Sequence, residues 1–134
     1  NAYDNSIVQT DQFLDSVINW LSAQSDKAQT AMIYVADHGE SLGENNIYLH
    51  GLPYSIAPDV QKHVPWITWL SPAMQARTHV TTGCLQQDVA QRRVTHDNYF
   101  HSVLGLMDVQ TGAYSPALDL FAGCRQQPNG PLAG

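Results

Sequence analysis

Charged residues are scarce in this chain, and positively charged ones are the scarcest. Six Lys and Arg stand against twelve Asp and Glu, which gives a net charge of −6. A nucleic-acid-binding surface needs a basic stripe, so this balance argues against a nucleic-acid partner. A site for a phosphate or sulfate group would also need positive charge from elsewhere, and a bound metal ion is a simple source.

Long hydrophobic runs are missing as well. The longest apolar segments have the length of strands, so the sequence shows no membrane-spanning helix, and no signal peptide is recognisable. These residues therefore carry no targeting signal of their own. The hydrophobic fraction of 43% nevertheless indicates a globular domain, and 134 residues are enough to form one.

Cysteine is limited to two residues, Cys84 and Cys124. Such a pair fits one disulfide in a protein from an oxidising compartment, or two reduced cysteines inside a core.

Hydrophobic periodicity predicts an α/β arrangement. Residues 30–36 are apolar without alternation, which is typical of a strand covered on both faces, and a helix followed by such a strand suggests a parallel sheet. Two strands alone are not independently stable, so we expect the remaining strands of the fold to lie outside this chain. The predicted elements are helices over 5–24, 96–108 and 115–121 and strands over 30–36 and 64–70.

Two potential metal ligands, Asp37 and His38, end the first predicted strand. In an open α/β sheet, ligands bind at the carboxyl ends of strands. Neighbours on a strand point to opposite faces, so both side chains can reach one ion only if the backbone turns, and Gly39 supplies that freedom. A carboxylate and an imidazole suit zinc, and the long loop over residues 37–63 returns with His50, which could bind a second ion or the substrate. A polar turn at a strand end is the alternative.

Four longer motifs extend this pattern, namely "DHGESLGENNIYLHGLPYSIAP", "QKHVPWITWLSP", "THDNYFHSVLGLMDV" and "ALDLFAGC". From Tyr3 to Cys124 the chain resembles the bacterial phosphoethanolamine transferases, including the mobile colistin-resistance enzymes, in the alkaline phosphatase and sulfatase superfamily. The resemblance implies a partial alkaline-phosphatase/sulfatase-like sandwich of the α/β class, with a mostly parallel sheet and flanking helices. It also implies a periplasmic catalytic domain at the bacterial inner membrane, which favours the disulfide.

The implied activity is zinc-dependent transfer of phosphoethanolamine from phosphatidylethanolamine to a lipid A phosphate or a similar phosphorylated glycolipid. By motif position, Asp37 and His38 resemble two ligands of the catalytic zinc, and His50 and Glu40 resemble residues of a second-metal or substrate pocket. The family's threonine nucleophile and its transmembrane domain would lie upstream, so no catalytic nucleophile is assigned here.

We therefore expect residues 1–125 to be the C-terminal portion of the catalytic domain, inactive alone, and residues 126–134 to be a loose tail. A sulfatase or phosphodiesterase of the same superfamily, or an inactive truncated product, is the alternative. The other histidines, His63, His79, His96 and His101, are interpreted as capping and surface residues, and Glu44 as a solvated loop acid.

Overall fold

The computed structural model describes residues 2–125, which form two compact units that divide between Ser71 and Pro72. Within the described residues, none of the helices combines the length and the hydrophobicity that crossing a lipid bilayer requires. The first unit contains α1 (Ala2–Ala23), β1 (Ala31–Val35), β2 (Ser41–Leu42), η1 (Glu44–Asn46), β3 (Tyr48–Leu49), α2 (Asp59–Lys62) and β4 (Trp66–Leu70). The second contains α3 (Pro72–Thr78), α4 (Thr82–Val89), α5 (Asp97–Leu106) and α6 (Ala122–Arg125).

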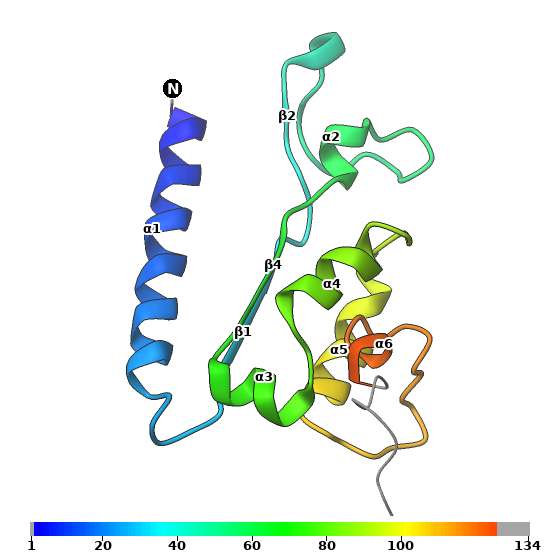
Figure 1. Ribbon diagram of the computed structural model, residues 1–134. Coiled ribbons are helices and arrows are strands. Elements are labelled where there is room, and N and C mark those ends of the chain that lie inside the picture. The colour runs from blue at the N-terminus through cyan, green and yellow to red at the C-terminus, as the bar shows by residue number, and fades with distance from the viewer. Residues whose placement is uncertain (1, 126–134) are drawn as a thin grey trace, which may run out of the picture. The chain divides into compact units, whose positions relative to one another are not determined.

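The two predicted strands exist and pair with each other, but they run antiparallel (Figure 1). The register places Val35 opposite Trp66 and Ala31 opposite Leu70. Parallel pairing would need a crossover connection, usually a full helix, whereas the segment between these strands holds β2, η1, β3 and the single helical turn α2. The expectation of parallel neighbours is therefore wrong for this pair, although an antiparallel strand is common within a mostly parallel sheet.

Neither strand is covered on both faces within the described residues. In β1 only Met32 is buried, and in β4 only Leu70 is buried. At the far end of the pair, the N–H of Ser71 donates to the Thr30 carbonyl at 2.9 Å, and the Thr30 hydroxyl donates to the Leu21 carbonyl of α1 at 3.1 Å. These bonds tie the end of α1 to the start of the sheet.

The segment predicted as a long loop, residues 37–63, contains regular secondary structure. β2 and β3 form a short antiparallel hairpin in which Ser41 pairs with Leu49. Its turn contains three residues with positive φ, namely Gly43, Asn45 and Asn46. Glycine and asparagine tolerate this left-handed conformation better than other residues, so the sequence "GENN" suits a hairpin turn.

The second unit packs helices around one disulfide and one buried acid. Cys84 of α4 and Cys124 of α6 are bonded, with their Cα atoms 5.9 Å apart, so the predicted disulfide is confirmed. Asp119 is fully buried, accepts hydrogen bonds from the Tyr114 hydroxyl at 2.6 Å and the Phe121 N–H at 2.7 Å, and pairs with Arg125. Burial, followed by the hydrogen bond to Asp119, raises the pKa of Tyr114 above its usual value.

The helix predicted over 96–108 is confirmed as α5, whereas the helix predicted over 115–121 is wrong. That stretch forms turns, because the Ser102 hydroxyl accepts the Leu120 N–H and Asp119 accepts the Phe121 N–H. Side chains thus compete with the helical backbone bonds. The predicted tail over 126–134 lies outside the described residues.

The disulfide gives a stability prediction for the second unit. Replacing both Cys84 and Cys124 by alanine should lower the free energy of unfolding by about 4 kcal/mol, because a bridge closing a loop of this length restricts the unfolded chain. Urea unfolding followed by circular dichroism measures the loss, and wild-type protein treated with dithiothreitol should match the variant. An unchanged unfolding midpoint would contradict the prediction.

Candidate metal centre

Asp37 and His38 follow β1 directly, where the pairing with β4 ends. The Asp37 carboxylate accepts the N–H of His38 at 3.1 Å, and its other oxygen lies 3.8 Å from Nε2 of the His38 ring. Two ligand atoms on a tetrahedral zinc with bonds of about 2.0–2.1 Å lie about 3.3 Å apart. The two side chains therefore already stand close to the separation that one ion requires.

The protonation of the His38 ring is fixed by its neighbour. Nδ1 lies 2.9 Å from the carbonyl oxygen of Gly39, and a carbonyl can only accept. Nδ1 therefore carries the proton, which leaves the lone pair of Nε2 for a metal. This is the usual arrangement of a ligating histidine, whose second nitrogen donates to a fixed acceptor.

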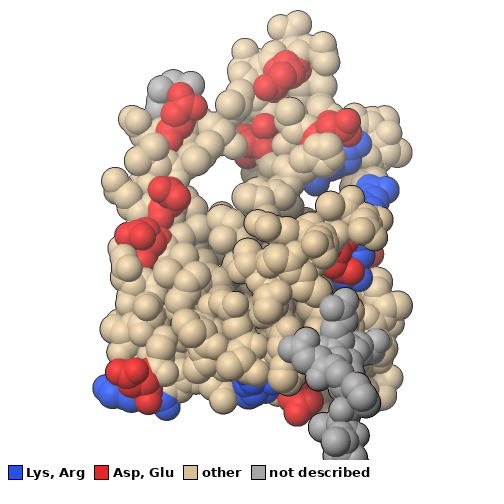
Figure 2. Space-filling model, in the orientation of Figure 1, with Lys and Arg blue, Asp and Glu red and all other residues tan. Residues whose placement is uncertain are grey.

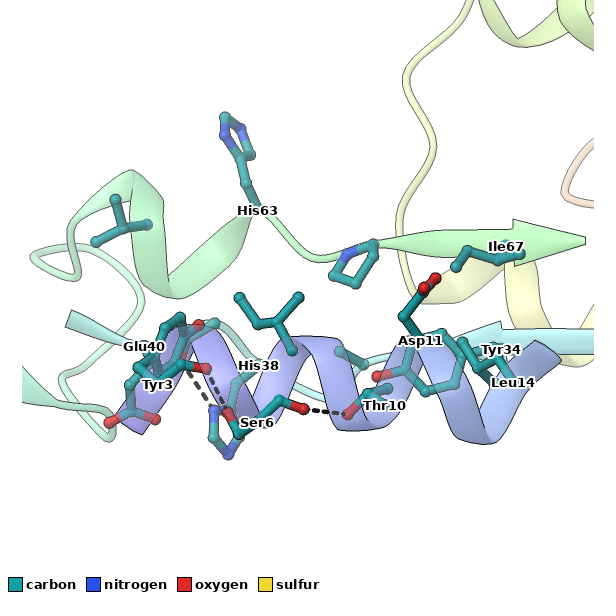
Figure 3. Close-up of a pocket in the computed structure, with 15 residues that line it drawn as sticks. Tyr3, Ser6, Thr10, Asp11, Leu14, Tyr34, His38, Glu40, His63 and Ile67 are labelled. Atoms are coloured by element: carbon teal, nitrogen blue, oxygen red, sulfur yellow. Dashed lines mark hydrogen bonds between the residues drawn. The ribbon is translucent and has the colours of Figure 1, made fainter. Parts of the chain in front are cut away.

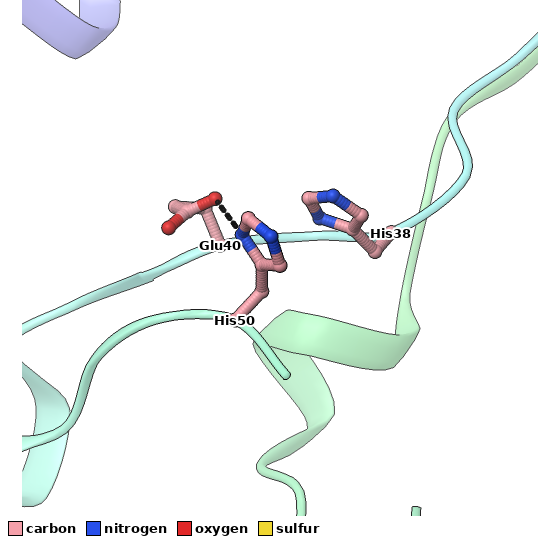
Figure 4. A group of neighbouring side chains, drawn as sticks. All are labelled: His38, Glu40 and His50. Carbon is pink, nitrogen blue, oxygen red and sulfur yellow. Dashed lines mark hydrogen bonds and ion pairs between the residues drawn. The ribbon is translucent and has the colours of Figure 1, made fainter. Parts of the chain in front are cut away.

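His50 and Glu40 form the second part of the centre. Nδ1 of His50 lies 3.0 Å from Oε2 of Glu40, and the His50 ring stacks on the His38 ring with centroids 3.7 Å apart (Figure 4). The Glu40 carboxylate accepts from Nδ1, so Nε2 of His50 is also directed to a ligand role. His38, Glu40 and His50 each offer one ligand atom, and these atoms lie within 4.8 Å of one another.

The donor set fits a metal ion. The second carboxylate oxygen of Glu40, Oε1, is buried and has no hydrogen-bond partner among the described residues. A buried unpaired carboxylate oxygen is costly, and a cation would satisfy it. Two imidazoles and carboxylates are a set that zinc accepts.

Asp37 lies outside this three-residue group, and its side chain is 90% exposed. The N–H of Asp37 itself, then the charge of His38 and the His38 N–H, lower the pKa of the Asp37 carboxyl below its usual value. The carboxylate therefore stays ionised, and available as a ligand, into more acidic solution than an isolated aspartate.

Gly39 is required for a reason other than the one the sequence suggested. Its φ is not in the left-handed region, so a turn does not demand it. A Cβ at this position would instead overlap the carbonyl oxygen of Val60, and the Gly39 N–H donates to the Gln61 carbonyl at 3.0 Å. Glycine at this position lets the segment over residues 37–40 approach α2 closely.

The backbone on either side of His50 is left-handed. Leu49 has φ 66° and Gly51 has φ 100°. A left-handed conformation costs a leucine about 1–2 kcal/mol, so surrounding contacts must hold it. Sequence reasoning missed the residue that makes one of these contacts, Gln61, whose side chain donates to the Leu49 carbonyl at 3.2 Å. A glutamine with no apolar role beside "KHVP" gives little sign of burial.

A cavity of about 410 Å³ in the first unit adjoins the centre. Its lining includes His38 and Glu40, and Figure 3 shows them at the opposite end of the cavity from Leu14 and Ile67. Side chains of α1 complete the wall. One end of the cavity therefore holds two of the candidate metal ligands, and the other end holds Asp11 and Tyr34 together with Leu14 and Ile67.

The remaining candidates have local structural contacts. Nδ1 of His101 accepts the N–H of Ser115 at 3.0 Å, and Glu44 accepts the N–H of Leu42 at 2.8 Å. Hydrogen bonds from its own N–H and that of Leu42 lower the pKa of Glu44. Glu44 is therefore a residue of the hairpin turn and not simply a solvated acid. His63 lines the cavity beside the centre.

Comparison with known families decides the relationship. A model of the sulfatase family matches residues 1–109. The chain belongs to the sulfatase family. Within this sulfatase relationship, the chain is 49% identical over 126 residues to phosphoethanolamine transferase EptA of Salmonella typhimurium, a match covering 94% of this chain and 23% of that protein. It is 41% identical over 109 residues to phosphatidylethanolamine transferase Mcr-1 of Escherichia coli, covering 81% of this chain and 18% of that one.

A solved structure agrees with the family. The soluble domain of lipooligosaccharide phosphoethanolamine transferase A from Neisseria meningitidis matches with a TM-score of 0.87 and 44% identity, over 93% of this chain and 37% of that one. The same Neisseria protein is also solved as an integral membrane protein, and the present chain matches 23% of the length of that structure. The resemblance to phosphoethanolamine transferases, the α/β fold and the relation to enzymes are therefore confirmed. The chain spans about a quarter of the length of its curated relatives.

The close approach at Gly39 gives a second prediction. Gly39→Ala should destabilise the first unit by roughly 1–3 kcal/mol and weaken metal binding, because the new methyl group must displace either α2 or the segment over residues 37–40. Urea unfolding and zinc titration measure the two effects. Gly83→Ala is the matched control, since a Cβ there meets open space in a helix and should stabilise by about 0.5–1 kcal/mol. Wild-type stability and zinc binding in Gly39→Ala would contradict the account.

Proposed function

We propose that residues 1–125 are the C-terminal portion of the catalytic domain of a zinc-dependent phosphoethanolamine transferase. The enzyme moves phosphoethanolamine from phosphatidylethanolamine to a lipid A phosphate or a similar phosphorylated glycolipid. It acts at the periplasmic face of the bacterial inner membrane, to which an N-terminal transmembrane domain attaches it. The transferred group carries a positive amine, so we expect modified lipid A to be less anionic, and polymyxin and colistin resistance is the trait proposed for this activity.

The observation that carries the proposal is the convergence of His38, Glu40 and His50 beside one cavity, with the Asp37 carboxylate 3.8 Å from the His38 ring. Asp37 and His38 are proposed as ligands of one zinc, through a carboxylate oxygen and Nε2. His50 and Glu40 are proposed to hold a second ion or the donor's phosphate group. When bound, zinc would stabilise negative charge on the transferring phosphoryl group.

The chain's own side chains bind and orient the reacting group. The bond from His38 Nδ1 to Gly39 fixes its ring, and Glu40 fixes the ring of His50. Nε2 of His50 can then bind an ion through its lone pair or, when it carries a proton, donate to a phosphate oxygen. Groups fixed in this way need little reorganisation during the reaction, which is the main source of electrostatic catalysis.

No threonine of this chain is proposed as the nucleophile. Thr10 lines the cavity, but its hydroxyl donates to the Ser6 carbonyl within α1. The nucleophile is therefore proposed to lie in the part of the enzyme that precedes Asn1, with a further acidic zinc ligand. On this proposal, the described residues supply only part of the site.

Exposed apolar side chains on α1 support the proposal of a partial domain. Phe13 is 65% exposed and Trp20 is 64% exposed, and Ile7 and Val8 are exposed on the same helix. On the face drawn in Figure 2, uncharged side chains cover most of the surface. Exposed apolar side chains such as those of α1 are normally covered by other structure when they form a contiguous patch. We propose that the remainder of the catalytic domain covers them.

The disulfide supports the periplasmic location. Bonded cysteines persist in oxidising compartments such as the bacterial periplasm and are rare in the cytosol. The membrane attachment is supported by the Neisseria relative, which has been solved as an integral membrane protein.

Hydrolysis is the competing activity, because the sulfatase family includes enzymes that pass a group to water. The names of the curated relatives favour transfer. A headgroup-transfer assay with labelled phosphatidylethanolamine distinguishes the two, since transfer labels the lipid acceptor and hydrolysis releases free phosphoethanolamine.

The half-site leads to a prediction about zinc. The 134-residue chain alone should bind zinc weakly and show no transferase activity, because only Asp37 and His38 are assigned to the first zinc and a tight site needs three or four protein ligands held in place. Both properties should appear in the longer enzyme. Isothermal titration calorimetry and the headgroup-transfer assay test the chain and the longer enzyme side by side. Nanomolar zinc affinity or turnover from the chain alone would show that its site is complete.

His50 gives a prediction about rate. In the longer enzyme, His50→Ala should lower the transfer rate by about 10²-fold and leave the melting temperature unchanged, because a preorganised polar contact to the phosphate group is lost. His79→Asn, which removes an exposed imidazole whose φ of 59° asparagine tolerates, should change neither quantity. Normal turnover by His50→Ala would return His50 to a purely structural role in the loop.

A further inference from the structure

We propose that Gln61 is a positioning residue for the metal centre, an inference that rests on the proposed function. Gln61 lies on α2, outside the group of ligands, and is 7% exposed. Its side chain bonds to Ser41, which follows Glu40, and to Leu49, which precedes His50. Its main-chain carbonyl bonds to Gly39, which follows His38. One buried residue therefore sets the separation of the three.

The side-chain amide of Gln61 joins the two strands of the hairpin. Nε2 donates to the Ser41 hydroxyl at 2.8 Å and to the Leu49 carbonyl at 3.2 Å. Ser41 follows Glu40 in the chain, and Leu49 precedes His50. Both hydrogens of the amide are thus used, one on each side of the hydrogen bond between Glu40 and His50.

The main chain of Gln61 holds the remaining member. Its carbonyl accepts the N–H of Gly39 at 3.0 Å. Gly39 lies between His38 and Glu40, and its own carbonyl accepts from the His38 ring. A path of two hydrogen bonds therefore runs from Gln61 through Gly39 to the nitrogen that fixes the His38 ring.

The chemistry of the site selects an amide. Leu49 offers only a carbonyl acceptor here, and the Ser41 hydroxyl accepts as well, so the residue at position 61 must supply two donors from one atom. A glutamate would present oxygens that cannot donate when ionised. A methionine would fill nearly the same volume with no donor at all.

The hairpin depends on this link because its own pairing is short. β2 and β3 contribute two residues each, and Leu49 is held in the left-handed region next to His50. A two-residue ladder is too short to fix side chains to the accuracy that a metal centre requires. The buried amide adds the missing constraint from outside the hairpin.

Cobalt and zinc titrations of the longer enzyme test this role. Gln61→Met should weaken zinc binding by about tenfold or more, as losses of outer hydrogen-bond partners do, and should change the visible absorption spectrum of bound Co²⁺. Gln86→Met makes the same chemical change at an exposed position of α4 and should leave both unchanged.

A second variant keeps the test decisive if Gln61→Met does not fold. Ser41→Ala removes one of the two acceptors of the Gln61 side chain and should alter the Co²⁺ spectrum in the same direction. In a folded variant that combines Ser41→Ala with Gln61→Met, the spectrum should be the same as in Gln61→Met alone. Wild-type affinity and spectrum in folded Gln61→Met, or an unchanged spectrum in folded Ser41→Ala, would overturn the role of Gln61. A wild-type enzyme that binds neither metal would instead overturn the proposed function, and this inference with it.

Discussion

The antiparallel pairing of β1 with β4 is the constraint on which the candidate centre depends. Its last registered pair, Val35 opposite Trp66, closes the segment 36–65, and all four proposed ligands lie inside that segment. Closing a segment of this length costs conformational entropy, and the hydrogen bonds of the strand pair offset that cost independently of the ligand contacts. The hydrogen bond from the Ala36 N–H to the Pro65 carbonyl, at 3.3 Å, continues the closure to the edge of the centre.

Inside the closed segment, close backbone approach and buried hydrogen bonds replace a hydrophobic core. Gly39 lets the segment over residues 37–40 lie against the Val60 carbonyl. The Gln61 side chain donates hydrogen bonds to both strands of the hairpin, at Ser41 and at Leu49. In this segment, Oε1 of Glu40 is buried without a hydrogen-bond partner among the described residues, while Oε2 of the same carboxylate accepts from His50. A carboxylate with one oxygen bonded to an imidazole and the other buried without a partner is suited to accept a cation.

The sequence was sufficient to predict the helices and strands with strong periodicity, the disulfide pair and the family. Asp37 and His38 could be recognised because an apolar strand ends on them, and His50 because the family motif continues to it. The antiparallel direction could not be read from "TAMIYVA" and "VPWITWL", since direction depends on what fills the connection. The role of Gln61 was also hidden, because its partners are 20 and 12 residues away in the chain. The assignment of individual ligands stays a prediction.

The central claim, that this segment holds zinc, is tested most directly by anomalous X-ray diffraction at the zinc absorption edge from crystals of the longer enzyme grown with zinc. The account predicts an anomalous peak within about 2.0–2.2 Å of Nε2 of His38 and of an Asp37 carboxylate oxygen. A second peak, if two ions bind, should lie beside His50 and Glu40. Ordered side chains at these positions with no peak near them, or zinc bound only at histidines such as His63 or His101, would contradict it.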